Sequence, residues 1–167
     1  MTAVQLAFLV GLTGVLAAVG WFALTVMRAA ARGDGGTHLS VSLLRRLGRS
    51  PQERAELNRW AFYLHRVTGM AILGFLCLHI LDVGTYAISR GTYDDLHELY
   101  GSAPMRVFES GLLVAILFHT FNGLRILAID LGDLGQLTAR RLLVPVVAVT
   151  LVLGVAGTVV IMAPVFS

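Results

Sequence analysis

Four long stretches of this chain contain no Asp, Glu, Lys or Arg, and they constrain the fold more than any other feature. They are Thr2–Met27, Val67–Leu81, Gly111–Leu124 and Leu142–Val165. With their apolar flanks, each approaches or exceeds the ~20 residues that a helix needs to cross a ~30 Å hydrocarbon core. Only helices or closed barrels satisfy the backbone in lipid, and these runs lack the alternation of barrel strands. The sequence therefore predicts an all-α integral membrane bundle of four transmembrane helices.

The composition agrees with a membrane protein. Charged residues make up only 14% of the chain and the mean hydropathy is +0.77, whereas soluble domains carry roughly 25% charged residues. The first stretch lacks the basic leader of a signal peptide, so we expect it to be retained as a helix. The single cysteine, Cys77, is expected to be a small buried apolar residue, because one thiol cannot form a disulfide within the chain.

The arginines predict the orientation, and all thirteen basic side chains are arginines. Segment 28–66 holds eight of them, whereas 88–106 holds two beside several acidic residues. The positive-inside rule then puts 28–60 and 130–141 in the cytoplasm, and 88–105 and both termini outside. The pI near 9.6 follows from this topology, so no nucleic-acid partner is needed to explain it.

Glycines and a Ser-Pro pair divide the chain further. We expect an N-terminal transmembrane helix at 1–27 and a basic cytoplasmic linker at 28–59, followed by a unit of three helices at 60–167. Within the linker, 39–47 is predicted to form a short interfacial helix.

Three histidines lie within the predicted spans, where polar side chains are expensive and usually functional. His65 and His79 are fourteen residues apart, which on a helix is about 21 Å, with directions only about 40° apart. If the third span ends near Ile129, His119 lies ~15 Å from that end. His38 and His97 fall in the connections, where we expect solvated side chains.

The chemistry of a mid-membrane imidazole leaves three alternatives open: a haem or another metal, a structural hydrogen bond, and a proton path. Gly69 and Gly123 each lie one turn from a histidine, so a flat macrocycle or a second helix can approach there. Arg66 and Arg125 lie near the predicted cytoplasmic ends, where they can pair with propionates or with a quinone carbonyl.

Two motifs on consecutive spans carry a family resemblance. The first is His65-Arg66-Val67-Thr68-Gly69, and the second runs from Phe118-His119 through Gly123-Leu124-Arg125 to Asp130. With the span that follows, residues 60–163 resemble the cytochrome b-type membrane-anchor subunit of succinate dehydrogenases and the related fumarate reductases. The N-terminal helix lies outside that three-span pattern.

The resemblance implies roles for single residues. His119 matches the haem axial ligand, Arg66 a quinone-contacting arginine, and His65 a histidine near the propionates and the quinone. Arg125 is expected beside a propionate. Where the family's single-haem members have a hydroxyl, this chain has Phe62, so we expect Tyr63 or Trp60 to take over that quinone contact.

The resemblance also implies a respiratory-chain complex of the tricarboxylic acid cycle in the bacterial inner (cytoplasmic) membrane. The expected partners are a second small anchor subunit, an iron–sulfur subunit and a flavoprotein. The flavoprotein carries the succinate site, so no catalytic residue is expected here. The expected cofactors are haem b and a quinone, with menaquinone favoured.

His79 is a candidate ligand of a second haem. Two-haem members of the wider superfamily stack their haems across the membrane, and the estimated depths place His79 and His119 roughly 12 Å apart. Each iron would then need a second ligand from a partner. The alternative is a structural His79 bonded to Asp82, one turn on.

Other functions would require different features of the sequence. A cytochrome b anchor of another quinone-linked dehydrogenase would bring two histidines of one chain to one depth. A transporter or proton channel would need acidic residues in mid-span, where this sequence has none. A cofactor-free structural membrane subunit is the remaining alternative.

Overall fold

Four long helices form the bundle, and the prediction of an all-α membrane protein is confirmed. The computed structural model describes residues 2–32 and 51–166. The long helices are α1 (Ala3–Arg32), α3 (Pro51–Ile88), α5 (Ala103–Gly132) and α7 (Leu143–Met162). Each contains a stretch long and apolar enough to cross a membrane. Two short helices, α4 (Arg90–Tyr100) and α6 (Gln136–Arg141), and a 3₁₀ turn at Ala163–Val165 complete the described chain.

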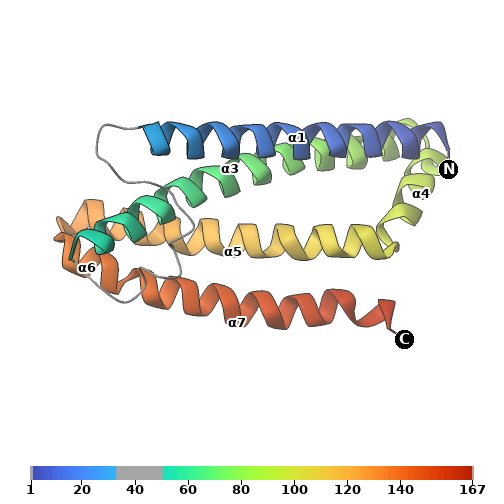
Figure 1. Cartoon of the computed structure of the whole chain (residues 1–167). Helices are drawn as coiled ribbons and strands as arrows, with labels where there is room; N and C mark the ends of the chain where they lie inside the picture. The colour runs from blue at the N-terminus through green and yellow to red at the C-terminus, as the bar shows by residue number, and fades with distance from the viewer. Residues whose placement is uncertain (1, 33–50, 167) are drawn as a thin grey trace.

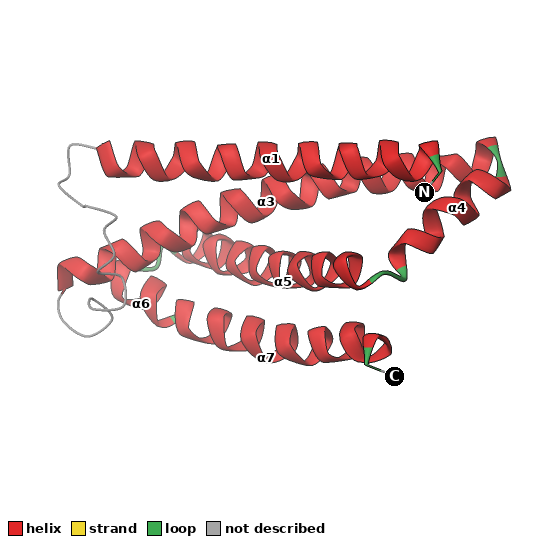
Figure 2. Ribbon diagram, turned by 45° about the vertical axis from the view of Figure 1, so that its right-hand side comes forward, coloured by secondary structure: helices red, strands yellow, loops and turns green. Residues whose placement is uncertain are grey.

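The long helices lie side by side in chain order, from α1 through α3 and α5 to α7 (Figure 1). Helix α3 runs obliquely, so that it lies against α1 near one end of the bundle and against α5 near the other (Figures 1 and 2). Both termini lie at the end where α4 lies, which we call the α4 end. The opposite end, where α3 begins and α5 ends, is called the α6 end.

Helix α3 begins earlier than its apolar stretch predicts. It starts at Pro51, a residue favoured in the first helical turn because its missing N–H has no helical acceptor there. The residues 51–59 that we assigned to the linker are therefore helical. They are rich in good helix formers such as Glu, Arg, Ala and Leu, which continue the helix beyond the apolar span. The interfacial helix predicted at 39–47 lies outside the described residues.

The surface is apolar, as lipid requires. Large side chains such as Trp21, Leu81 and Val160 are two-thirds or more exposed. Because lipid is as apolar as these side chains, close packing rather than hydrophobic burial must hold the helices together. Glycine allows this close packing at the interface of α1 and α3, where a Cβ on Gly74 would lie 2.5 Å from Val15.

Helix α4 closes one end of the bundle. Its N-cap is Ser89, whose hydroxyl accepts a hydrogen bond from the Thr92 N–H. Its buried Leu96 joins a core cluster with side chains of α1, α3 and α5. The Gln5 side-chain amide of α1 donates to the Asp95 carbonyl at 2.7 Å. These contacts tie the N-terminal helix to the three-helix unit.

Candidate functional site

The site is built where α3 and α5 pack, around His65 and His119. Their imidazole rings are stacked, with centroids 3.9 Å apart and planes 6° from parallel. A Cβ on Gly69 would lie 2.8 Å from His119 Cε1, and a Cβ on Gly123 would lie 3.3 Å from His65 Cε1. Each glycine thus makes room for the histidine of the opposite helix. Of the two uses proposed for these glycines, the structure shows close helix packing.

The two histidines lie at one depth, which the sequence estimate does not predict. Because α3 starts at Pro51 and α5 ends at Gly132, His65 and His119 are a similar number of residues from the α6 end. His79, fourteen residues beyond His65, then lies about 21 Å along the bundle from this pair. The separation of roughly 12 Å expected between His79 and His119 is too small.

A backbone hydrogen bond determines the tautomer of His119. Its Nδ1 lies 2.9 Å from the His65 carbonyl oxygen, and since a carbonyl only accepts, Nδ1 must carry the hydrogen. In the neutral imidazole, Nε2 is then the nitrogen without a hydrogen. The Thr68 hydroxyl lies beside this bond, with its oxygen 3.0 Å from the same carbonyl and 3.4 Å from Nδ1.

This arrangement suits a haem ligand. Histidines that bind metals usually donate the other ring N–H to a carbonyl or carboxylate, which orients the ring and raises the basicity of the ligating nitrogen. In addition, His65 Nδ1 is buried and has no hydrogen-bond partner in the described part of the chain. The residues therefore fit a haem whose iron is bound by His119. Residues 2–32 and 51–166 contain no cluster of three or more His, Cys, Asp or Glu able to hold a bare metal ion.

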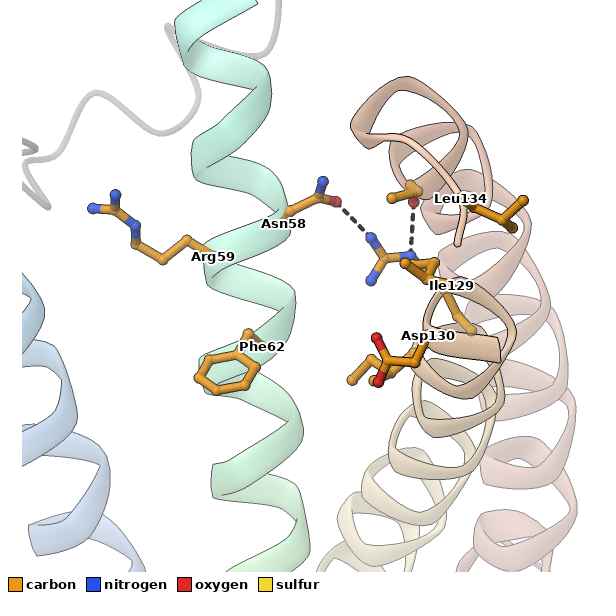
Figure 3. Close-up of a pocket in the computed structure, with 9 residues that line it drawn as sticks. Asn58, Arg59, Phe62, Ile129, Asp130 and Leu134 are labelled. Carbon is orange, nitrogen blue, oxygen red and sulfur yellow. Dashed lines mark hydrogen bonds between the residues drawn. The ribbon is translucent and has the colours of Figure 1, made fainter. Parts of the chain in front are cut away.

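Arg125 belongs to a buried polar network near the α6 end. The residue is 7% exposed, and its guanidinium donates to the Ala139 carbonyl at 2.8 Å, to Asn122 Oδ1 at 3.1 Å, and to Asn58 Oδ1. Asn122 is fully buried and donates to the Ala61 carbonyl at 3.3 Å. Figure 3 draws the bonds from Arg125 to Asn58 and Ala139 as dashed lines.

This network joins α3, α5 and α6. At least three of the guanidinium N–H groups donate hydrogen bonds within the protein. Arg125 therefore links these helices. The sequence analysis missed Asn58 and Asn122. For Asn122 the available signal was an asparagine in the middle of an uncharged span, since a buried amide needs partners. Asn58 lies among charged residues and gave no such signal.

A cavity of about 520 Å³ opens beside this network. In Figure 3, Asn58 points from α3 toward α5, and Asp130 points from α5 toward α3. The lining residues come from three segments: Asn58, Arg59 and Phe62 of α3; Arg125, Ile126, Ile129 and Asp130 of α5; and Leu134 and Ala139 beyond it.

Two of the predicted quinone contacts lie beside Phe62. The Arg66 guanidinium lies 4.3 Å from the centre of the Phe62 ring, in cation–π contact, and the Tyr63 ring lies 5.8 Å from it. Phe62, which stands where the family's single-haem members have a hydroxyl, lines the cavity, whereas Arg66, Tyr63 and Trp60 are not among its lining residues.

His79 stands apart from this site. It is exposed, and its ring stacks on Phe75 with centroids 5.7 Å apart. Asp82 Oδ2 accepts a hydrogen bond from the Tyr100 hydroxyl of α4 at 2.9 Å, and the buried Asp82 Oδ1 has no partner among the described residues, so the Asp82 side chain does not bond to His79. The expectation of a buried Cys77 is wrong, since the thiol is exposed. Helix α3 turns this position away from its neighbours, and a thiol is tolerated in lipid because it is nearly apolar.

The fold and site together define a multi-pass helical membrane protein with a ligand-type histidine held between two spans. The chain belongs to the succinate dehydrogenase/fumarate reductase transmembrane subunit family, whose model matches residues 45–157. It is a membrane-anchor subunit of that family and thus part of an oxidoreductase complex with other subunits. Helix α1 precedes the matched region.

Two relatives agree with this assignment. The chain is 33% identical over 117 residues to the succinate dehydrogenase 2 membrane subunit SdhC of Mycobacterium tuberculosis, covering 68% of this chain and 86% of the relative. It is 38% identical over 74 residues to the succinate dehydrogenase hydrophobic membrane anchor subunit of Halobacterium salinarum, covering 44% of this chain and 57% of that protein.

Proposed function

We propose that this chain is the cytochrome b subunit that binds haem b and quinone in a succinate:quinone oxidoreductase. It passes electrons from an iron–sulfur subunit to the quinone, while a flavoprotein oxidises succinate. A second small anchor subunit completes the membrane part of the complex. The complex lies in the bacterial inner membrane, with the α6 end and the basic linker facing the cytoplasm.

The observation that carries this proposal is the hydrogen bond from His119 Nδ1 to the His65 carbonyl. It leaves Nε2 as the basic nitrogen and fixes the ring plane, as ligation requires. When bound, the haem supplies a one-electron carrier between the iron–sulfur subunit and the quinone. His119 would hold the iron, and His65 Nδ1, which has no hydrogen-bond partner among the described residues, would be available to a propionate or quinone oxygen.

The geometry does not favour the alternative in which two histidines of this chain bind one iron. Two imidazoles that held one iron would have to approach it from opposite sides, whereas the His65 and His119 rings meet face to face with centroids 3.9 Å apart. A second ligand to an iron held by His119 would therefore have to come from the partner anchor subunit.

The cavity at the α6 end supports a quinone site. An aromatic wall at Phe62 suits a flat quinone ring, and the Arg66 guanidinium beside it can donate to a carbonyl oxygen and stabilise charge that develops on reduction. Menaquinone is the favoured substrate. The Arg125 guanidinium lines the same cavity, so it contributes positive potential to this site even though several of its N–H groups are used within the protein.

A second haem at His79 is part of the proposal. His79 is exposed in this chain, and the carboxylate of Asp82, its expected structural partner, is engaged by Tyr100. His65 and His79 are about 21 Å apart along α3, which would place the two haems at different depths in the membrane. Each haem would supply a one-electron carrier at its depth.

The test is the haem content of the purified complex. His119→Ala should remove the haem near the α6 end, and His79→Ala should lower the haem-to-flavin ratio from two to one. His97→Ala, a change outside the spans, is the control and should retain all haem. A His119→Ala complex that assembles with its full haem content and an unchanged reduced-minus-oxidised spectrum contradicts the ligand assignment. A wild-type ratio of one contradicts the second haem.

A further inference from the structure

The Thr68 side chain contacts the hydrogen bond that holds His119. Its single hydroxyl hydrogen is shared between the Leu64 carbonyl at 2.8 Å and the His65 carbonyl at 3.0 Å, and its oxygen lies 3.4 Å from His119 Nδ1. Thr68 is 8% exposed, so water does not compete strongly for these contacts. The residue therefore touches both partners of the His119–His65 bond.

The His65 carbonyl oxygen is crowded with donors. As part of α3 it accepts the helical N–H of Gly69, and it also accepts His119 Nδ1–H and the Thr68 hydroxyl. A carbonyl oxygen has two lone pairs, so three donors divide its acceptor strength. Each bond is weaker than it would be if one donor were absent.

We propose that Thr68 is a positioning residue that sets the strength of the His119–His65 hydrogen bond and, through it, the reduction potential of the iron bound at Nε2. This rests on the proposed haem ligation by His119. By taking part of the carbonyl's acceptor strength, the hydroxyl keeps Nδ1–H more firmly on the ring. The ligand is then less electron-rich, and the reduced iron is favoured.

The sign of the effect follows from the distances. Removing the hydroxyl frees the His65 carbonyl, which lies 2.9 Å from Nδ1, and strengthens that bond. It also removes Thr68 as an acceptor, but its oxygen lies 3.4 Å from Nδ1, beyond the range of about 2.7–3.2 Å for good N–H···O bonds. The carbonyl effect is the larger, so loss of the hydroxyl should lower the potential.

A purely local role for Thr68 makes a different prediction. Threonines inside helices often donate to the carbonyl one turn back, as Thr68 does to Leu64. If that bond were the whole role of the hydroxyl, its loss would change helix stability slightly and leave the iron unaffected.

The experiment is a redox titration of the haems in the intact complex, with haem content and absorption spectrum measured on the same samples. Thr68→Val removes the hydroxyl and keeps the branched shape, whereas Thr68→Ser restores the hydroxyl. Thr120→Val is the matched control, because Thr120 adjoins His119 in sequence but its side chain is exposed. We expect Thr68→Val to shift one haem to lower potential, and Thr68→Ser and Thr120→Val to titrate as the wild type.

The outcomes separate this inference from the function on which it rests. A wild-type complex without haem contradicts the proposed function itself. Normal haem content with the same potential in Thr68→Val and wild type contradicts the role of Thr68 and leaves the ligand assignment intact. Should Thr68→Val lose the haem, retention in Thr68→Ser supports the hydroxyl, whereas loss in both variants overturns it in favour of packing.

Discussion

Replacing Gly69 by alanine should displace His119, and the structure allows the effect to be estimated. The new Cβ would lie 2.8 Å from His119 Cε1 and 3.3 Å from Nδ1. The His119 ring cannot move away freely. The His65 ring stacks on it with centroids 3.9 Å apart, and His119 Nδ1 is bonded to the His65 carbonyl. Either the ring must turn or α3 and α5 must separate.

The magnitude comes from two opposing terms. Overpacking a tight contact costs about 1–3 kcal/mol, whereas alanine gains about 1 kcal/mol over glycine in helix propensity. The net loss in stability should therefore be up to about 2 kcal/mol, most of it at the interface of α3 and α5. Since the strain acts on the imidazole, haem binding should weaken more than the fold as a whole.

The assay compares haem content per flavin and thermal stability of purified complexes. Gly84→Ala is the matched control, because a Cβ at Gly84 on the same helix meets nothing within 4 Å. We expect Gly69→Ala to lose haem and stability, Gly123→Ala to lose less since its Cβ contact is 3.3 Å, and Gly84→Ala to lose neither. If Gly69→Ala matches Gly84→Ala in both measurements, the packing of His119 against Gly69 is not what holds the ring.

Two further predictions concern the two ends of the bundle. Arg66→Leu should strongly reduce electron transfer from succinate to quinone while sparing succinate oxidation by a soluble dye, because its guanidinium lies beside the cavity wall at Phe62; equal loss of both activities would instead indicate failed assembly. At the other end, burial and then the hydrogen bond to Asp82 raise the pKa of the Tyr100 phenol above its ordinary value. A raised pKa means that the stabilisation by the Tyr100–Asp82 bond is fully present below the ordinary tyrosine pKa of about 10 and declines as the pH rises further. Tyr100→Phe should therefore lower stability by about 1–2 kcal/mol at neutral pH, with the gap to wild type narrowing above about pH 10; a gap that varies between pH 6 and 8 would refute this account.

The helical spans follow from the sequence alone, because lipid offers the backbone no partner and an uncharged run of this length must satisfy its own hydrogen bonds. The candidate residues of the site follow in the same way, since ligand-type and cationic side chains such as His119 and Arg66 are rare inside spans and therefore noticeable. The depths of the histidines in the membrane were predicted less accurately from the sequence. A helix does not end where its apolar stretch ends, and α3 continues to Pro51 through polar residues that are good helix formers.

Only the tertiary structure decided which side chains meet. The stacking of His65 on His119 depends on how obliquely α3 and α5 cross and on which faces they turn to each other, and neither is encoded in a local pattern. The same crossing brings Asn58 and the Ala139 carbonyl to Arg125, residues 67 and 14 positions away in the chain. It also leaves Cys77 facing outward. A span's composition specifies that it is a helix in lipid, but the face it buries is chosen by small residues such as Gly69 and Gly74, whose partners are known only once the helices have packed.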